Sequence, residues 1–173
     1  MITLLLIIFI FYILNNNKEY FIEEKIDIYK NEFLNIIEKF NLEGDLNIKY
    51  RVGIISSINK KYLNLNESSV DFNSLMLKEL YLKKLNPKNK FYIFNKNKFF
   101  LNYNTEKNQG DIKLINLDEN NEFEIIDIGD KFYKLDFNKF RFTGNIKIKD
   151  KYLGSNGFSN NPEILFFDII ILL

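Results

Sequence analysis

Hydrophobic residues are most concentrated at the start of this chain of 173 residues, where MITLLLIIFIFYIL at residues 1–14 is almost wholly apolar. This is the length of the hydrophobic region of a signal peptide, and it is shorter than the roughly 20 residues that span a bilayer. The stretch lacks a basic start, and the NNNKEY that follows it offers no small-residue cleavage site. Residues 1–17 are therefore interpreted as a signal peptide or an uncleaved signal anchor, with a buried first element as the alternative.

Between residues 18 and 44 the apolar positions recur every three or four residues, which predicts an amphipathic helix. Asn17 can cap the start of this helix, and Gly44 lies just past its end. The apolar face could dock or dimerise, or it could pack on the chain's own domain or form a stalk from the anchor. The residues on this face are Ile22, Ile26, Tyr29, Phe33, Ile36 and Phe40.

From residue 45 onwards the period changes to two, which predicts a β-rich domain over residues 45–173. The apolar residues Leu46, Ile48, Tyr50 and Val52 alternate with polar ones, and residues 61–65 can return as a second strand across SSINK. Residues 69–85 instead predict a second, shorter helix that ends before Pro87. Hairpins are expected in three later stretches, KFYIFNKNKFFLNY, DIKLINLDENNEFEIIDI and KFYKLDFNKFRFTGNIKIKD.

The sequence ends in a second apolar run, EILFFDIIILL, which carries Asp168 in its middle. A charge there argues against a membrane span, because the apolar run on either side is far too short. A continuous run of Ile, Leu and Phe at strand length is typical of a buried central strand. We therefore predict that Phe167 is buried and that Asp168 points from the opposite face of the same strand.

The stretches IKIKDKYLGSNGF, SNNPE and ILFFDIIILL stand in this order at the end of the sequence. In that order, and nearly in their spacing, they resemble the final strands and loops of the FKBP-type peptidyl-prolyl isomerase family. LNIKYRVG and NKKYLNLNESS are similar to its first long strand and the turn that follows, and FEIIDIG is similar to the strand that brings an aromatic residue to the pocket. The resemblance implies an α+β fold in which a curved antiparallel sheet wraps on a short helix. Here the amphipathic helix precedes it, and an insertion lies near residues 67–110.

The same resemblance implies an apolar pocket for the proline of a substrate peptide, lined by Tyr50, Tyr62, Phe123, Phe137, Tyr152, Leu153 and Phe167. Leu153 is the alternative to Tyr152 as the loop residue that meets the substrate. Phe137 or Phe132 would replace the family's Trp at the pocket floor, because this chain has no Trp, and Leu63 stands where the family has an Asp. Both departures predict a weakened isomerase. The alternative is a catalytically inactive FKBP-like binding module anchored by its N-terminus.

Composition limits the chemistry that such a site can use, because the chain contains no Cys, His or Trp. Thiolate and imidazole metal sites, thiol catalysis and a Ser/His/Asp triad are excluded. An isomerase needs no nucleophile or proton shuttle, since it binds the twisted amide more tightly than the planar one. We therefore expect no acid–base catalytic residue, no metal and no cofactor. The expected partner is a proline-containing peptide or a client protein of the secretory pathway or endoplasmic reticulum, and residues 1–14 could contact the membrane.

Nucleic acid is not expected as a partner. The 24 basic residues nearly balance the 23 acidic ones, so no net charge attracts a polyanion. Residues 83–107 hold seven Lys and one acidic residue among aromatic residues, a pattern found in grooves that bind single strands. The same alternation is typical of a hairpin with one solvated face. LDENNE at residues 117–122 lacks the spacing and the Gly of a calcium loop and predicts a turn.

Overall fold

The computed structural model describes residues 2–13, 50–85, 88, 90–127, 133–136 and 138–171. Residues 2–13 form a helix, and the described residues from Tyr50 to Ile171 form β-strands with one short 3-10 helix. The α+β prediction with a large antiparallel sheet is confirmed at this level. The amphipathic helix predicted for residues 18–44, and Phe132 and Phe137, lie outside the described residues.

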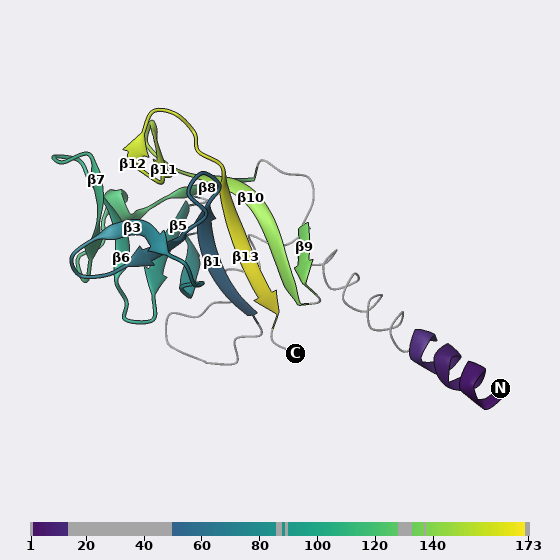
Figure 1. Ribbon diagram of the computed structural model, residues 1–173. Helices are drawn as coiled ribbons and strands as arrows, with labels where there is room; N and C mark the ends of the chain where they lie inside the picture. The colour runs from purple at the N-terminus through teal and green to yellow at the C-terminus, as the bar shows by residue number, and fades with distance from the viewer. Residues whose placement is uncertain are drawn as a thin grey trace.

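The described strands form one sheet (Figure 1). In chain order they are β1 (Tyr50–Ser56), β2 (Tyr62–Leu65), β3 (Val70–Ser74), β4 (Leu80–Leu85), β5 (Lys90–Asn95), β6 (Phe100–Asn104), β7 (Gln109–Lys113), β8 (Glu124–Asp127), β9 (Tyr133–Asp136), β10 (Lys139–Ile148), β11 (Lys151–Gly154), β12 (Gly157–Ser159) and β13 (Leu165–Ile171). The 3-10 helix η1 (Glu119–Asn121) lies between β7 and β8.

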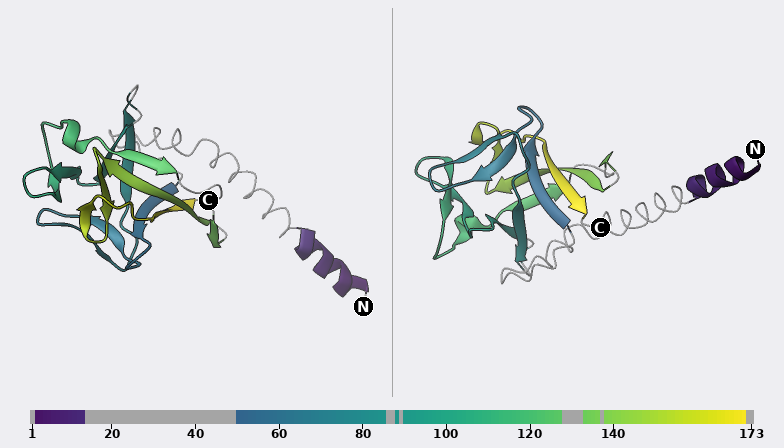
Figure 2. Two further views of the ribbon diagram at one scale, coloured as in Figure 1. Left: turned by 90° about the horizontal axis from the view of Figure 1, so that it is seen from above. Right: turned by 60° about the horizontal axis from the view of Figure 1, so that its bottom comes forward.

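Every strand pairing in the sheet is antiparallel, and the main path of neighbours runs β12-β11-β10-β13-β1-β4-β5-β6-β7. Off this path, β2 pairs with β1 and β3, while β8 and β9 pair with β10. A bridge between Phe91 of β5 and Phe123, just before β8, connects the two halves of the path. The sheet therefore curls back toward itself, as two further views show (Figure 2).

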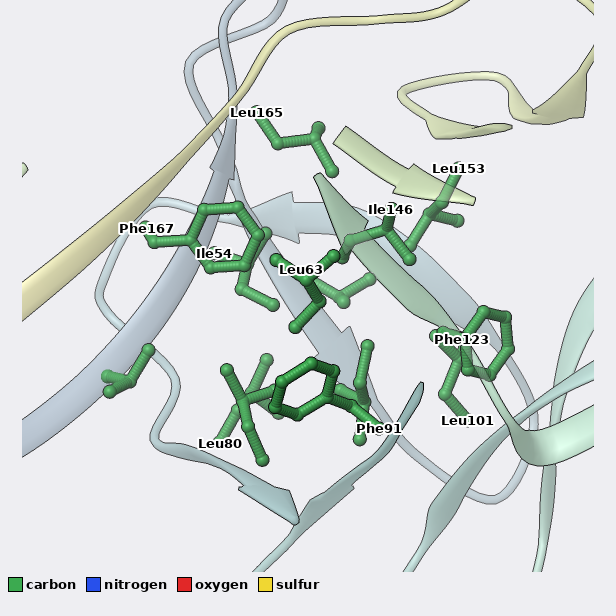
Figure 3. Packing of buried hydrophobic residues seen from close by; sticks show 14 of the residues in the cluster. Ile54, Leu63, Leu80, Phe91, Leu101, Phe123, Ile146, Leu153, Leu165 and Phe167 are labelled. Carbon is green, nitrogen blue, oxygen red and sulfur yellow. The ribbon is translucent and has the colours of Figure 1, made fainter. Parts of the chain in front are cut away.

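The inner face of the curled sheet forms the hydrophobic core (Figure 3). Strand alternation sends every second side chain into this space, and ten residues there are the largest that are fully buried. They come from strands far apart in the sequence, so the core closes only when the whole sheet has formed. These residues are Ile54, Leu63, Leu80, Leu82, Phe91, Ile93, Leu101, Phe123, Ile146 and Phe167.

The C-terminal run is a central strand, as predicted. β13 lies between β10 and β1, with Phe167 opposite Ile54 on one side and opposite Phe142 on the other. Phe167 is fully buried, and its ring lies 5.6 Å from that of Phe142. Asp168 leaves the other face of the strand, which confirms the alternation, yet it is buried as completely as Phe167.

The prediction of a second helix over residues 69–85 is wrong. The chain forms β3 and β4 there, joined by a turn that exposes Leu75 and Met76. Leu80 and Leu82 of β4 point into the core, while Tyr81 and Lys83 lie on the other face. Leu, Lys and Glu favour helices in isolation, but burial against the sheet overrides that weak preference here.

Two of the three expected hairpins are confirmed, because β5 pairs with β6 and β9 pairs with β10. The hairpin predicted across DIKLINLDENNEFEIIDI is wrong. β7 pairs with β6, whereas β8 pairs with β10, and η1 separates the two strands. The polar residues between them cap η1, since Asp118 accepts from the backbone of Asn120 and Asn121 reaches back to Asp118. β1 pairs with β2, as expected, and Ile55 is the partner of Tyr62.

Candidate functional site on the outer face of the sheet

Three of the predicted pocket residues, Phe123, Leu153 and Phe167, belong to the hydrophobic core cluster (Figure 3). Their exposed fractions are 0%, 2% and 0%. Phe123 stacks on Phe158, which is the cross-strand neighbour of Leu153. Side chains packed in this way fill the space between the strands of the curled sheet.

The predicted tyrosines do not join these three residues. Tyr62 is buried, but its hydroxyl points to Asp168 on the face opposite Phe167. Tyr152 is half-buried on β11, where the Lys147 ammonium lies 5.6 Å from the centre of its ring. Tyr50 begins β1 and is paired with Ile171 through the backbone, and Phe137 lies outside the described residues.

The outer face of the sheet carries a partly buried polar group that we call the Asp168 cluster: Asp168, Arg141, Lys139 and Tyr62. Asp168 Oδ1 accepts a hydrogen bond from Arg141 Nε at 2.7 Å, and Oδ2 accepts from Arg141 Nη2 at 3.0 Å. The Tyr62 hydroxyl donates to Oδ2 at 2.5 Å and itself accepts from Lys139 Nζ at 3.2 Å. Lys139 Nζ lies 3.6 Å from the same carboxylate oxygen. Both oxygens of the carboxylate are therefore occupied.

Strand register builds the Asp168 cluster. Arg141 of β10 and Gly53 of β1 are the two direct neighbours of Asp168 across the sheet. A Cβ on Gly53 would lie 2.6 Å from Leu77 Cγ and 3.1 Å from Tyr62 Cδ1, so these side chains cover the strand at that point. The absence of a side chain at Gly53 lets the Tyr62 ring approach closely enough to reach the carboxylate.

The electrostatics of the Asp168 cluster favour a fixed ion pair over acid–base chemistry. Burial, together with the hydrogen bond to Asp168, raises the pKa of Tyr62 above its ordinary value of 10.0. The hydrogen bond to Asp168 also raises the pKa of Arg141 above its ordinary value. Two cations face one carboxylate, so the cluster as a whole keeps a positive charge. We expect the cluster to hold the strands in register, because its hydrogen bonds connect β2, β10 and β13 around the buried carboxylate.

The sequence signals only part of the Asp168 cluster. A carboxylate inside an apolar strand predicts a partner of opposite charge, since an unpaired buried charge is costly. Arg141 is one of two arginines in a chain otherwise rich in Lys, and both arginines lie on this outer face beside β13. Which cation meets Asp168 depends on the pairing of β10 with β13, and that pairing cannot be obtained from local sequence patterns.

The N-terminal helix is a second unusual surface, because each of its residues 2–13 is exposed. Its large apolar side chains are between 40% and 83% exposed, and they leave the helix on all sides. Figure 1 draws this helix clear of the strands. Within the described residues, no helix is both long enough and apolar enough to cross a membrane.

The described residues of the other candidate sites are not arranged to bind a metal ion or a nucleic acid. Within the described residues, acidic side chains form no group that could hold a metal ion. In the lysine-rich region of β4, β5 and β6, the ring of Phe94 stacks on two others. Its centroid lies 5.5 Å from that of Tyr81 and 4.8 Å from that of Phe100. Phe94 and Phe100 are only 4% and 6% exposed, so they offer little free ring surface for a nucleic-acid base.

Comparison with known proteins places the chain in no family, because no family model matches it and no curated protein matches its sequence.

Proposed function

We propose that this protein is a membrane-anchored interaction module whose β-domain is not catalytic. The observation that carries the proposal is the N-terminal helix, whose apolar side chains are exposed on every side. A soluble helix normally places its apolar residues on one face and polar residues on the other. A helix with no polar face requires an apolar environment, and a lipid bilayer provides one.

The length of the apolar run sets how it would use the bilayer. Residues 1–14 would extend about 21 Å as an α-helix, against about 30 Å for the hydrocarbon core. Burying a Leu, Ile or Phe side chain is worth about 1.5–3 kcal/mol, so several of them together supply a substantial partition energy. A segment of this kind anchors the chain from one side of the membrane.

The packing of the predicted pocket supports a non-catalytic domain over an isomerase. An isomerase binds its twisted amide in an apolar pocket that the substrate can enter. Phe123, Leu153 and Phe167 instead belong to the packed core and have almost no exposed surface. The short helix that an FKBP-like sheet would wrap is not among the described residues from Tyr50 to Ile171, where η1 is the one helical element.

Membrane anchoring is tested with the full chain by flotation with phosphatidylcholine vesicles. We expect the unaltered protein to float and Ile7→Asp to abolish flotation, because a carboxylate in the middle of the helix opposes insertion. Leu75→Asp is the matched control, since Leu75 is 81% exposed on the turn between β3 and β4. Equal flotation of the Ile7→Asp and Leu75→Asp variants would contradict the proposal. A fluorescent fusion of the full chain tests the associated expectation of a secretory-pathway location.

The isomerase that the FKBP resemblance implies is the competing function, and a coupled assay on an X-Pro tetrapeptide separates the two. We expect no turnover above the uncatalysed rate, because Phe123 and Phe167 are fully buried and cannot contact a substrate. Turnover that disappears in a Tyr50→Ala, Tyr152→Ala double variant would favour the isomerase instead. Peptide binding without turnover, lost in the same variant, would identify proline-containing peptides as the ligand of the module.

A further inference from the structure

We infer that the outer face of β13 carries a second membrane contact, a basic and apolar patch that binds an anionic lipid surface. This inference rests on the proposed anchoring and says which part of the β-domain would meet the bilayer. We call the surface the Phe166 patch: Ile58, Lys60, Arg141, Ile164 and Phe166. It lies beside the Asp168 cluster on the same face of the sheet.

Two cations converge on the aromatic ring of the Phe166 patch. The Lys60 ammonium lies 5.4 Å from the centre of the half-buried Phe166 ring, and the Arg141 guanidinium lies 4.6 Å from it. Arg141 uses Nε and Nη2 to bind Asp168. The Lys60 ammonium can bind phosphate or carboxylate oxygens.

One cation of the Phe166 patch has no carboxylate partner. Asp168 is shared between Arg141 and Lys139, and Asp136 is the strand neighbour of Lys139. The Glu163 carboxylate accepts hydrogen bonds from Ser56 and Ser155. Lys60 has no carboxylate at ion-pair distance among the described residues, so it is the cation that can contact anionic lipid headgroups.

Two exposed isoleucines border the cations. Ile58 is 69% exposed and Ile164 is 47% exposed, and the backbone N–H of Ser57 donates to the carbonyl of Ile164. The β1–β2 turn and the segment before β13 are therefore held together, so both isoleucines lie at one end of the outer face. Apolar side chains beside lysine and arginine are the pattern of proteins that dock on membrane interfaces.

The short length of the apolar run at residues 1–14 supplies the reason for a second contact. A short apolar anchor gives reversible binding, and stable attachment usually needs an additional basic or lipid signal. The Phe166 patch would provide that signal from the folded domain. Together the two contacts would hold one face of the β-domain against the bilayer and leave the opposite side accessible.

The experiment measures partition of the full chain onto vesicles of phosphatidylcholine alone and onto vesicles with about one third phosphatidylserine. Lys60→Glu should lower partition onto the anionic vesicles by on the order of tenfold, and should leave the neutral vesicles unaffected. Lys98→Glu is the matched control, because Lys98 is also exposed and also has a positive φ, 58° against 60° for Lys60. We expect that control to change partition by no more than about twofold, since only a charge near the lipid surface contributes strongly.

The outcomes separate the patch from the anchor. If Lys60→Glu and Lys98→Glu weaken anionic binding equally, the patch is refuted, while loss of flotation in Ile7→Asp would still support the anchor. If Ile7→Asp has no effect, the anchor fails, and a difference between the two lysine variants would still support the patch. Release from anionic vesicles by inorganic phosphate, at constant ionic strength, would assign the patch to a free anion and overturn the membrane contact.

Discussion

The two most apolar stretches of the chain, residues 2–13 and β13, have similar side chains and opposite environments. Every residue of the helix is exposed, whereas Leu165 and Phe167 of β13 are fully buried. β13 has a hydrogen-bonded strand on each side, and its alternate residues face the core. The helix makes no such contacts among the described residues. A strongly apolar stretch therefore favours burial away from water. Its structural neighbours determine whether it is buried in a protein core or left to insert into lipid.

β13 also shows that burial on one strand can have two physical causes. Phe167 is buried by other hydrocarbon side chains, and the adjacent Asp168 is buried by a guanidinium, an ammonium and a phenol. The first arrangement gains free energy from the removal of apolar surface from water. The second must offset the desolvation of a charge with close hydrogen bonds. Substitutions in each place should therefore differ in size and in their dependence on pH.

The largest expected effect is at Phe167. Phe167→Ala should lower the free energy of unfolding by about 3–5 kcal/mol, because it leaves a cavity in the middle of the core. Denaturant unfolding followed by circular dichroism measures this value. A loss below about 1 kcal/mol would show that β13 does not contribute to the core in solution.

The next effect is at Arg141. Arg141→Met should cost about 2–4 kcal/mol, because Asp168 stays buried with only Lys139 and Tyr62 to compensate its charge. Arg51→Met is the matched control on the same face, since Arg51 is 54% exposed and lies 3.9 Å from Glu79. An exposed pair of that kind contributes about 0–1 kcal/mol. If both substitutions cost the same in urea unfolding, the buried ion pair does not stabilise the fold.

The fold was predictable where a single strand carries its own signal. Period-two alternation predicted β1, and an apolar run of strand length predicted the buried β13 with Phe167 inside. Prediction failed where pairing with distant strands decides the structure. The local sequence predicted that Leu80 and Leu82 lie in a helix. They lie in a strand because β4 pairs with β1 on one side and with β5 on the other.

The candidate site was less predictable than the fold. Asp168 was recognisable as a charge within a strand, but its full burial and its pairing with Arg141 depend on a register between segments 27 residues apart. Tyr62 was expected to line a pocket, and the structure instead directs its hydroxyl to Asp168. Apolar composition alone does not predict that residues 2–13 are exposed, because another part of the chain could cover them.

A smaller effect is expected at Tyr62. Tyr62→Phe should cost about 1–2 kcal/mol at neutral pH, because one hydrogen bond to a buried carboxylate is lost while Arg141 remains. The raised pKa of Tyr62 means that the folded state holds this proton more tightly than the unfolded chain. Stability from this source is complete below pH 10.0 and is lost as the pH rises through the raised pKa. Unfolding curves at rising alkaline pH should therefore converge for the two proteins, and a constant difference would contradict the assignment.

The smallest expected effect completes the comparison between the two apolar stretches. Phe9→Ala removes the same atoms as Phe167→Ala, but from a side chain that is 60% exposed on the N-terminal helix. No cavity forms and no core contact is lost, so the free energy of unfolding of the β-domain should change by less than about 0.5 kcal/mol. Partition onto vesicles should nevertheless fall several-fold, because an exposed phenylalanine contributes to insertion into lipid. A large loss of stability in Phe9→Ala would mean that the helix packs on protein, and the N-terminal stretch would then belong with β13 as part of a buried core.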